Sequence, residues 1–307
     1  MVAPVAEHQV TSHRVALAVA VGCGALVALQ QRLNGGLKEA LGDAVLAAVV
    51  SFGSGLVVVA AVVAVRRSSR CALPVVRHQP RWLLLGGLGG ASLVAVGAAA
   101  APEIGVALLT VALVGGQTVG GLVVDGAGVA PGGRRALTPY RALGAALCLG
   151  AIVISTSGQA VHPRPLLLVL VVLAGLLTAG QQALNGRLRQ ATGDAAVATL
   201  VNFVVGTVAL LVGLAVRRLV VGVHIDHWPG QWWLYAGGLL GACFVASAAV
   251  VVRQLGVLRF GLAVTAGQLV GALVLDATVP ERGHGVALPT VVGAAVTLVA
   301  VAVSGRA

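Results

Sequence analysis

The chain has 307 residues, of which 58% are hydrophobic and only 9% are charged, and its mean hydropathy is +1.00. A soluble domain carries about a quarter charged residues, so this composition excludes a water-soluble globular protein and indicates several membrane-spanning helices. The net charge of +11 does not indicate a nucleic-acid partner, because the arginines lie between hydrophobic segments and not on a basic face interleaved with aromatic residues.

Ten hydrophobic segments follow one another along the chain, and a helix of about 20 residues crosses a ~30 Å hydrocarbon core. In order, the segments span residues 15–37, 43–65, 82–101, 105–124, 138–157, 166–188, 194–216, 232–252, 257–275 and 287–304. The start resembles a signal peptide. The same hydrophobic run recurs internally from Leu166, however, so we interpret the segment from Val15 as a retained helix that follows a tail, residues 1–14.

The two halves of the chain repeat one pattern. A 14-residue stretch begins at Gln30 and recurs from Gln181, 151 residues later, with nine identical positions. Matches at the same offset continue through Phe52 and Phe203 to Trp82 and Trp233. We therefore predict two five-helix units, residues 15–157 and 166–307, joined by a linker at 158–165.

An odd number of crossings forces the second unit to enter the membrane from the opposite side. The predicted fold class is therefore an all-α polytopic membrane protein with ten transmembrane helices in two inverted five-helix repeats. Inverted repeats are characteristic of secondary transporters. Of the 20 Lys and Arg residues, 14 fall on the side that holds both termini and six on the other, which predicts cytoplasmic termini.

Glycine is abundant, with 43 residues, and forms four GxxxG pairs at matching repeat positions. Small residues let helix backbones approach closely inside lipid. The pairs predict helix packing within one bundle, with a dimer interface as the alternative use. The pairs begin at Gly86, Gly116, Gly237 and Gly267.

Carboxamide side chains recur near the end of the first helix of each unit. Helical spacing places each set on one face, and an amide in hydrocarbon must find a partner or line a wet cavity. The sets either line a solute pathway or act as interhelical contacts beside Asn-Gly helix ends capped by Gly35 and Gly186. They comprise Gln30, Gln31 and Asn34 in the first unit and Gln181, Gln182 and Asn185 in the second.

Other polar residues fall deeper in the hydrophobic segments. Gln117 and Gln268 lie near the middle of equivalent segments, and Ser51 and Asn202 hold another equivalent pair of places, so all four are candidate pathway residues. Asp125 and Asp276 end the fourth and ninth segments. They are candidates for ion or proton coupling, with snorkelling into loop water as the alternative. Asp43 and Asp194 begin helices, where a carboxylate stabilises the N-terminus.

The repeated motif resembles a known family. A Q-x-x-L-N-G-x-L-x-x-x-x-G pattern from Gln30, followed by Ser51-Phe52-Gly53, with Asn202-Phe203-Val204 in the second copy, is similar to the YdcZ-like family of bacterial inner-membrane proteins. That family belongs to the drug/metabolite transporter superfamily, which includes the EamA-like proteins. The resemblance covers residues 15–304 and implies two inverted halves with alternating access. Small multidrug exporters of this superfamily couple protons through a first-helix glutamate. Residues 15–37 contain no acidic residue, so Asp125 or Asp276 would have to substitute.

The sequence therefore predicts a bacterial inner-membrane secondary transporter that exports a small metabolite or amphipathic compound. The alternatives are a lipid or lipid-linked flippase, for which Arg32 is a candidate headgroup ligand, and a non-transporting scaffold or accessory subunit. No catalytic motif is visible, and four cysteines without metal-ligand spacing predict no metal or cofactor. The expected partners are a small-molecule substrate and membrane lipid. The substrate, the coupling ion and the choice between monomer and homodimer stay open.

Overall fold

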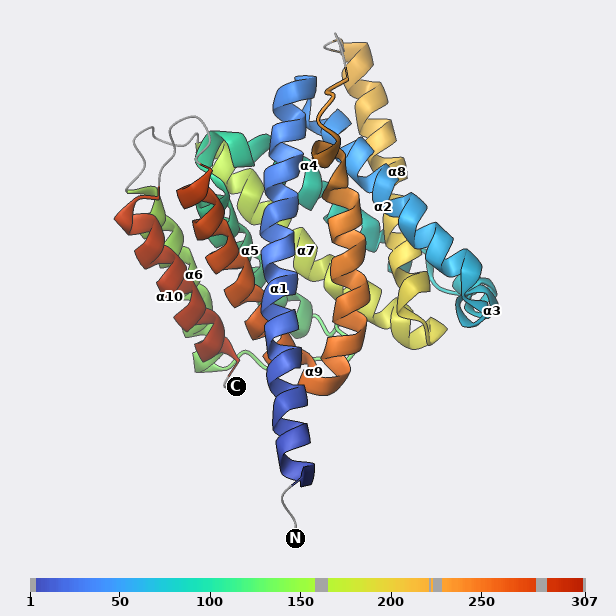
Figure 1. The fold of residues 1–307 in the computed structure, drawn as a ribbon, viewed down its shortest axis with the longest axis horizontal. Coiled ribbons are helices and arrows are strands. Elements are labelled where there is room, and N and C mark those ends of the chain that lie inside the picture. Colours follow the sequence, from blue (N-terminus) through green and yellow to red (C-terminus); the bar gives the residue numbers. More distant parts are fainter. Residues whose placement is uncertain (1–3, 158–164, 221, 223–227, 280–285, 306–307) are drawn as a thin grey trace.

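The computed structural model describes residues 4–157, 165–220, 222, 228–279 and 286–305 (Figure 1). All of the regular secondary structure in these ranges is helical, which confirms an all-α polytopic fold. The first half contains α1 (Pro4–Leu41), α2 (Ala44–Val65), α3 (Arg67–Val76), the short 3-10 helix η1 (Arg81–Leu85), α4 (Gly86–Ile104), α5 (Val106–Gly126) and α6 (Pro139–Thr156). The second contains α7 (Pro165–Thr192), α8 (Ala195–Val220), the 3-10 helix η2 (Trp232–Ala236), α9 (Gly237–Thr278) and α10 (Leu288–Ser304).

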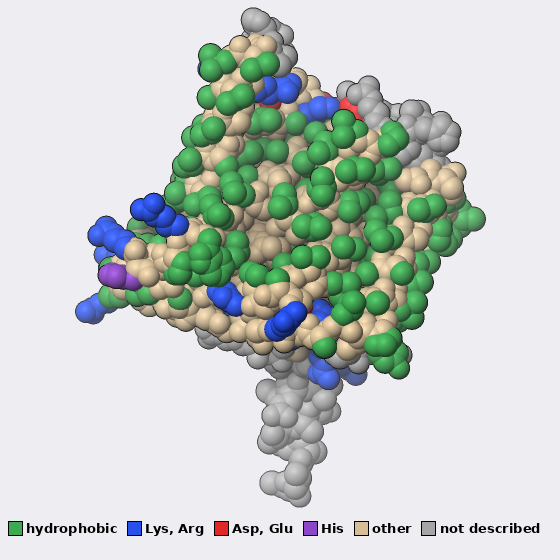
Figure 2. Space-filling view, turned by 180° about the vertical axis from the view of Figure 1, so that it is seen from behind, with side chains coloured by type: hydrophobic (Ala, Val, Ile, Leu, Met, Phe, Trp, Pro, Cys, Tyr) green, Lys and Arg blue, Asp and Glu red, His purple; other side chains and the backbone are tan. Residues whose placement is uncertain are grey.

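The surface matches a membrane environment. Eight helical stretches in the described ranges are long and apolar enough to cross a membrane, and Trp232–Phe244 and Leu288–Ser304 are shorter apolar helices. Figure 2 shows hydrophobic side chains spread over the middle of one face, with Lys and Arg side chains gathered toward its edges. Exposed hydrophobic residues such as Val57, Leu166 and Val208 belong to this apolar surface and would contact lipid.

Three helices differ from the predicted segments. α1 begins at Pro4, within the predicted tail, although its apolar membrane-crossing stretch starts at Arg14. α3 lies between two predicted segments, in an arginine-containing stretch for which no helix was predicted. The predicted segments 232–252 and 257–275 both fall in η2 and α9, and α9 is helical without a break between them. The count of ten crossings is therefore not established. Most of the predicted linker lies outside the described residues.

The course of the chain agrees with an odd number of crossings in each half. In Figure 1, α1 begins and α10 ends at the lower edge of the molecule, which we call the terminal edge. The end of α6 and the start of α7 lie toward the upper edge, which we call the opposite edge. α7 therefore starts from the side of the molecule at which α1 ends.

The core is formed by helices of one half packed against helices of the other. α7 packs on α4 and α5, α1 packs on α9, α2 packs on α8, and α6 packs on α10. Phe52 of α2 and Phe203 of α8, which are equivalent in the repeat, contact each other with their ring centroids 5.0 Å apart. The aromatic pair therefore lies where the two halves meet.

The repeated motif ends each first helix at its Gly-Asp pair and not at its Asn-Gly pair. α1 continues through Gly35 to Leu41, and Gly42 then adopts φ 72°, a left-handed conformation that favours glycine. Asp43 caps α2 by accepting a hydrogen bond from the Leu46 N–H at 2.8 Å. Gly193 (φ 69°) and Asp194 repeat this arrangement before α8. Gly35 and Gly186 lie inside α1 and α7, so the capped Asn-Gly ends of the packing alternative are not present.

Candidate functional site

Glycines bring the helices of the two halves into direct backbone contact. A Cβ atom at Gly175 of α7 would collide with the Leu113 carbonyl oxygen of α5, and one at Gly24 of α1 would collide with the Val264 carbonyl oxygen of α9. The same crossings hold Gly116 and Gly267, the first members of two predicted GxxxG pairs. These pairs therefore pack helices within the chain, as predicted.

The first amide set lies on α1, beside glycines of α9 and α4. The Gln30 amide nitrogen would lie 3.0 Å from a Cβ at Gly241. Asn34, with no exposed surface, and Ser51 of α2 both lie against Gly237. Gln31 is 3% exposed and lies against Gly97 of α4. Three glycines thus provide the space that these polar side chains occupy.

The second amide set lies on α7 and is completed by Asn202 of α8. Its Oδ1 accepts hydrogen bonds from Gln181 Nε2 at 3.0 Å and from Asn185 Nδ2 at 3.2 Å. Gln181 lies beside Gly90, and Asn185 beside Gly86. The glycines contacted by the second set are the repeat equivalents of Gly241 and Gly237.

The two sets differ in how well their polar atoms are paired. Both polar side-chain atoms of Asn34, together with Ser51 Oγ and Gln31 Oε1, are buried with no hydrogen-bond partner among the described residues. Ser51 occupies the position equivalent to Asn202, but its side chain is shorter and its hydroxyl has no hydrogen-bond partner among the described residues. Buried polar atoms without partners cost free energy. In the second set Gln181 Oε1 is such an atom, so the first set has more buried polar atoms without a partner.

The remaining predicted glutamines occupy different surroundings. Gln182, the repeat equivalent of the buried Gln31, is exposed. The backbone nitrogens of Gln117 and Gln268 lie at the crossings with Gly175 and Gly24, respectively. Each crossing is six residues, or roughly 9 Å along the helix axis, from the first glutamine of an amide set. The structure thus places the central glutamines at a level between the two sets.

Asp276 caps a helix of the other half. Its carboxylate accepts hydrogen bonds from the backbone N–H groups of Val106 at 3.0 Å and Ala107 at 2.7 Å, at the start of α5. α4 ends at Gly105 (φ 77°), so the chain turns there and leaves these N–H groups unpaired within α5. With 5% exposure, Asp276 does not snorkel into loop water, and its negative charge faces the positive end of a helix.

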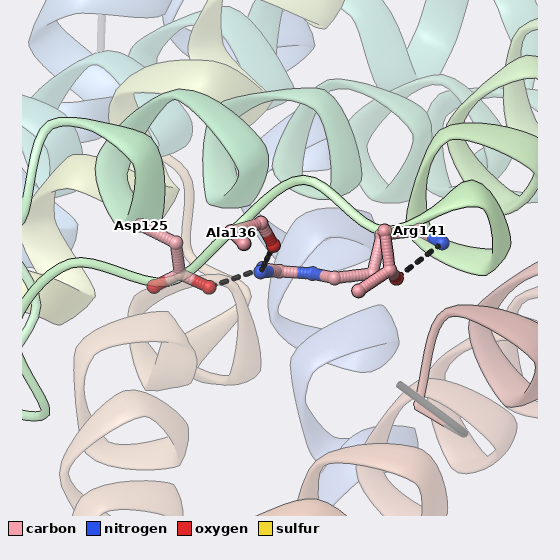
Figure 3. Close-up of polar contacts among 4 residues, drawn as sticks. Asp125, Ala136 and Arg141 are labelled. Carbon is pink, nitrogen blue, oxygen red and sulfur yellow. Dashed lines mark hydrogen bonds and ion pairs between the residues drawn. The ribbon is translucent and has the colours of Figure 1, made fainter.

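Asp125, the repeat equivalent of Asp276, forms an ion pair. Figure 3 shows the Arg141 guanidinium between the Asp125 carboxylate and the Ala136 carbonyl oxygen. Arg141 begins α6, whose N-cap Thr138 accepts from the Arg141 backbone N–H at 3.4 Å. The Asp125 side chain is 17% exposed. Its partner Arg141 lies 16 residues further along the chain, too far for a local sequence pattern to indicate the pair.

Two equivalent Asp–Arg arrangements join α2 to α8 at opposite edges, and sequence reasoning missed both. Asp43 forms an ion pair with Arg217 of α8. Asp194 accepts from Ser69 Oγ at 2.8 Å. Burial opposes ionisation of Asp194. Its hydrogen bonds from Ser69 and the backbone, together with the charge of Arg66, nevertheless hold its pKa below the usual range. Arg66 and Arg217 are repeat equivalents, a recurrence that could have suggested the pairing.

Arg32, the candidate headgroup ligand of a flippase, donates a hydrogen bond to the Val279 carbonyl oxygen. This contact gives no support to lipid binding at that position. Within the described ranges, no three His, Cys, Asp or Glu side chains gather as metal ligands, and no residues are assigned to a metal or cofactor.

Comparison with known proteins identifies relatives in the membrane. Residues 15–154 and 166–303 each match the family described as "Putative inner membrane exporter, YdcZ". The chain is also 29% identical over 130 residues to the inner membrane protein YdcZ of Escherichia coli (strain K12). This alignment covers 42% of the chain and 85% of the relative. One such protein thus corresponds to about half of this chain.

Proposed function

Because the chain belongs to the YdcZ family of inner-membrane transport proteins, we propose that it exports a small metabolite or amphipathic compound by alternating access between its two halves. The terminal edge lies in the cytoplasm, where the Arg-rich loops satisfy the positive-inside rule. In this proposal the two segments that match the family, residues 15–154 and 166–303, are two inverted units of one transporter.

One observation carries the proposal. Carboxamides are buried or partly buried where the halves meet. Gln30 and Asn34 face glycines of the second half, and Gln181 and Asn185 face glycines of the first. A polar group is costly inside a membrane unless it is paired or serves a pathway. The unpaired atoms of Asn34 and Ser51 become hydrogen-bond partners for a solute when α1 and α9 separate. The first amide set, the central glutamines and the second amide set follow one another across the membrane. A solute therefore meets hydrogen-bonding side chains at each level.

Proton or ion coupling is assigned to the two repeated aspartates. Asp125 is the more accessible of them, because its side chain keeps 17% exposure and its carboxylate can exchange the ion pair with Arg141 for one with a solute cation. Asp276 is held by two backbone N–H groups. Its carboxylate exchanges these partners for a solute cation only if α5 and α9 move apart.

Transport by purified protein in liposomes tests the proposal. Liposomes loaded with an extract of small bacterial metabolites are monitored by mass spectrometry, with and without a pH gradient, for compounds that only the protein releases. The combined variant Gln117→Leu/Gln268→Leu is expected to release these compounds at least ten-fold more slowly while keeping its helical content. Gln182→Leu, which alters an exposed glutamine, should transport like the wild type.

The scaffold alternative makes the opposite prediction. If the amides serve only for packing, the wild-type protein releases no compound faster than empty liposomes do. The two hydrogen bonds that Gln181 and Asn185 donate to Asn202 are the observation that favours this alternative. Release that depends on Gln117 and Gln268 would exclude it.

A further inference from the structure

A pocket of about 460 Å³ opens at the terminal edge, outside the amide sets. One wall is the turn and η1 that follow α3, including Gln79 and Trp82. The opposite wall is the end of α7, with Arg187 and Gln190, and Pro131 of the α5–α6 loop completes the lining. Three segments distant in sequence thus meet around one space.

The pocket combines one cation with an aromatic ring. The Arg187 guanidinium carbon lies 5.7 Å from the centre of the Trp82 ring, a distance at which cation and ring attract. Arg187 also donates one hydrogen bond to the Gly128 carbonyl oxygen at 2.5 Å. A guanidinium has five N–H donors, so this contact holds the side chain in place and leaves donors for a ligand.

The surroundings of the pocket favour an anion. No carboxylate is among the residues that line it. Arg77 and Arg81, on the segment that forms the Gln79–Trp82 wall, are both exposed. The nearest acidic residue along α7 and α8, Asp194, is engaged by Ser69 and by the start of α8. Charges of one sign around a cleft raise the local concentration of oppositely charged ligands.

The equivalent place at the opposite edge is filled. The position equivalent to Arg187 is Gly36, and that of Leu83 is Leu234. A methyl carbon of Leu234 lies 3.1 Å from where a Cβ of Gly36 would stand. A leucine therefore packs onto glycine there, whereas the terminal edge has an arginine and an open space. The repeat can be packed at this position with a glycine, as Gly36 shows, so packing alone does not require an arginine at 187.

We propose that this pocket binds the anionic head of an amphipathic molecule, with Arg187 contacting the anion and with Trp82, Leu83 and Pro131 contacting the start of the apolar chain. The inference rests on the proposed function and deepens it, because it assigns the class of compound that enters from the cytoplasm. A free amphipathic anion and an anionic phospholipid share this chemistry.

Binding can be measured without transport. The protein is prepared in nanodiscs of zwitterionic lipid with Trp82 as its only tryptophan, and its fluorescence is titrated with decyl phosphate, decanol and decyltrimethylammonium. Decyl phosphate should change the fluorescence in a saturable manner, with an affinity at least ten-fold above those of the other two. The affinity should fall as salt is added.

Matched variants locate the site. Arg187→Gln should weaken decyl phosphate binding at least ten-fold, and Arg187→Lys should weaken it less because it keeps the charge. Arg189→Gln removes an arginine of the same helix that does not line the pocket and should leave binding unchanged. Equal loss in Arg187→Gln and Arg189→Gln, or equal binding of decanol, would overturn the proposal. Circular dichroism and thermal melting establish that each variant is folded.

Nanodiscs that contain anionic phospholipid distinguish a bound phospholipid from a free amphipathic anion. A lower affinity for decyl phosphate in these discs, absent in Arg187→Gln, identifies phospholipid as an occupant. An unchanged affinity identifies the free amphipathic anion. If binding fails in every disc while metabolite release still depends on Gln117 and Gln268, the pocket inference is wrong and the proposed export function stands.

Discussion

At the scale of single residues, equivalent positions of the repeat perform different tasks. Asp276 caps α5, whereas Asp125 forms an ion pair with Arg141. Asn202 accepts two hydrogen bonds, whereas Ser51 at the equivalent place has an unpaired hydroxyl. The two repeats therefore share their helical pattern but not their polar contacts.

The Asn202 contacts give a prediction about stability. Asn202→Ser leaves the amide donors of Gln181 and Asn185 without their acceptor, so we expect it to lower the free energy of unfolding by about 1–3 kcal/mol. Ser51→Ala removes a hydroxyl that has no partner and should be neutral or slightly stabilising. Thermal unfolding in nanodiscs measures both. Equal destabilisation by the two variants would contradict the assigned hydrogen bonds.

At the scale of helices, glycines decide which elements can touch. Gly116 packs against the Val172 carbonyl of α7, and Gly267 packs against the Val21 carbonyl of α1. The two contacts are equivalent in the repeat and both join opposite halves. A side chain at either position must push two backbones apart, because a backbone carbonyl cannot move aside as a flexible side chain can.

We therefore expect Gly116→Ala and Gly267→Ala each to destabilise the protein by about 1–3 kcal/mol through overpacking. Gly121→Ala provides the control on α5, since nothing lies within 4 Å of its added Cβ. It should be neutral or stabilise the helix by up to about 1 kcal/mol. Apparent melting temperatures in one detergent compare the three variants. Tolerance of both Gly116→Ala and Gly267→Ala would show that the crossings are looser than described.

Much of the helical pattern could be predicted from sequence, because hydropathy and helix-ending residues act locally. α2, α5 and α6 begin and end within two residues of their predicted bounds. α3 was missed because its arginines at 67 and 70 suggested a loop, although Ser69 and Ala72 are buried. The Asn-Gly signal near Asn34 does not end the helix, because α1 continues to Leu41 and packs Leu37 and Leu41 against α2, α4 and η2.

The candidate site was predictable only in part. Carboxamides in hydrophobic segments are visible in any sequence, and Gln30, Gln31, Asn34, Gln181 and Asn185 are buried or partly buried in the structure. That Gln30 and Asn34 face glycines of the second half, and that Gln181 and Asn185 face glycines of the first, depends on how the halves pack, which no local pattern contains. For the same reason the exposure of Gln182 and the pairing of Asp125 with Arg141 needed the three-dimensional structure.

At the scale of the whole molecule, the proposed alternating access requires that the two amide sets become accessible to water from opposite faces of the membrane. Single cysteines test this directly after the native Cys23, Cys71, Cys148 and Cys243 have been replaced. Asn34→Cys and Asn185→Cys place a thiol in the first and second set. Leu109→Cys, in the apolar core with no exposed surface, is the control for a permanently buried position.

The measurement is the labelling of these thiols by a membrane-impermeant maleimide in right-side-out and inside-out vesicles. We predict that Asn34→Cys reacts from the outer face and Asn185→Cys from the cytoplasmic face, both at least ten-fold faster than Leu109→Cys. Labelling of neither thiol above the rate of Leu109→Cys, from either face, would contradict the account and reduce the amides to packing contacts.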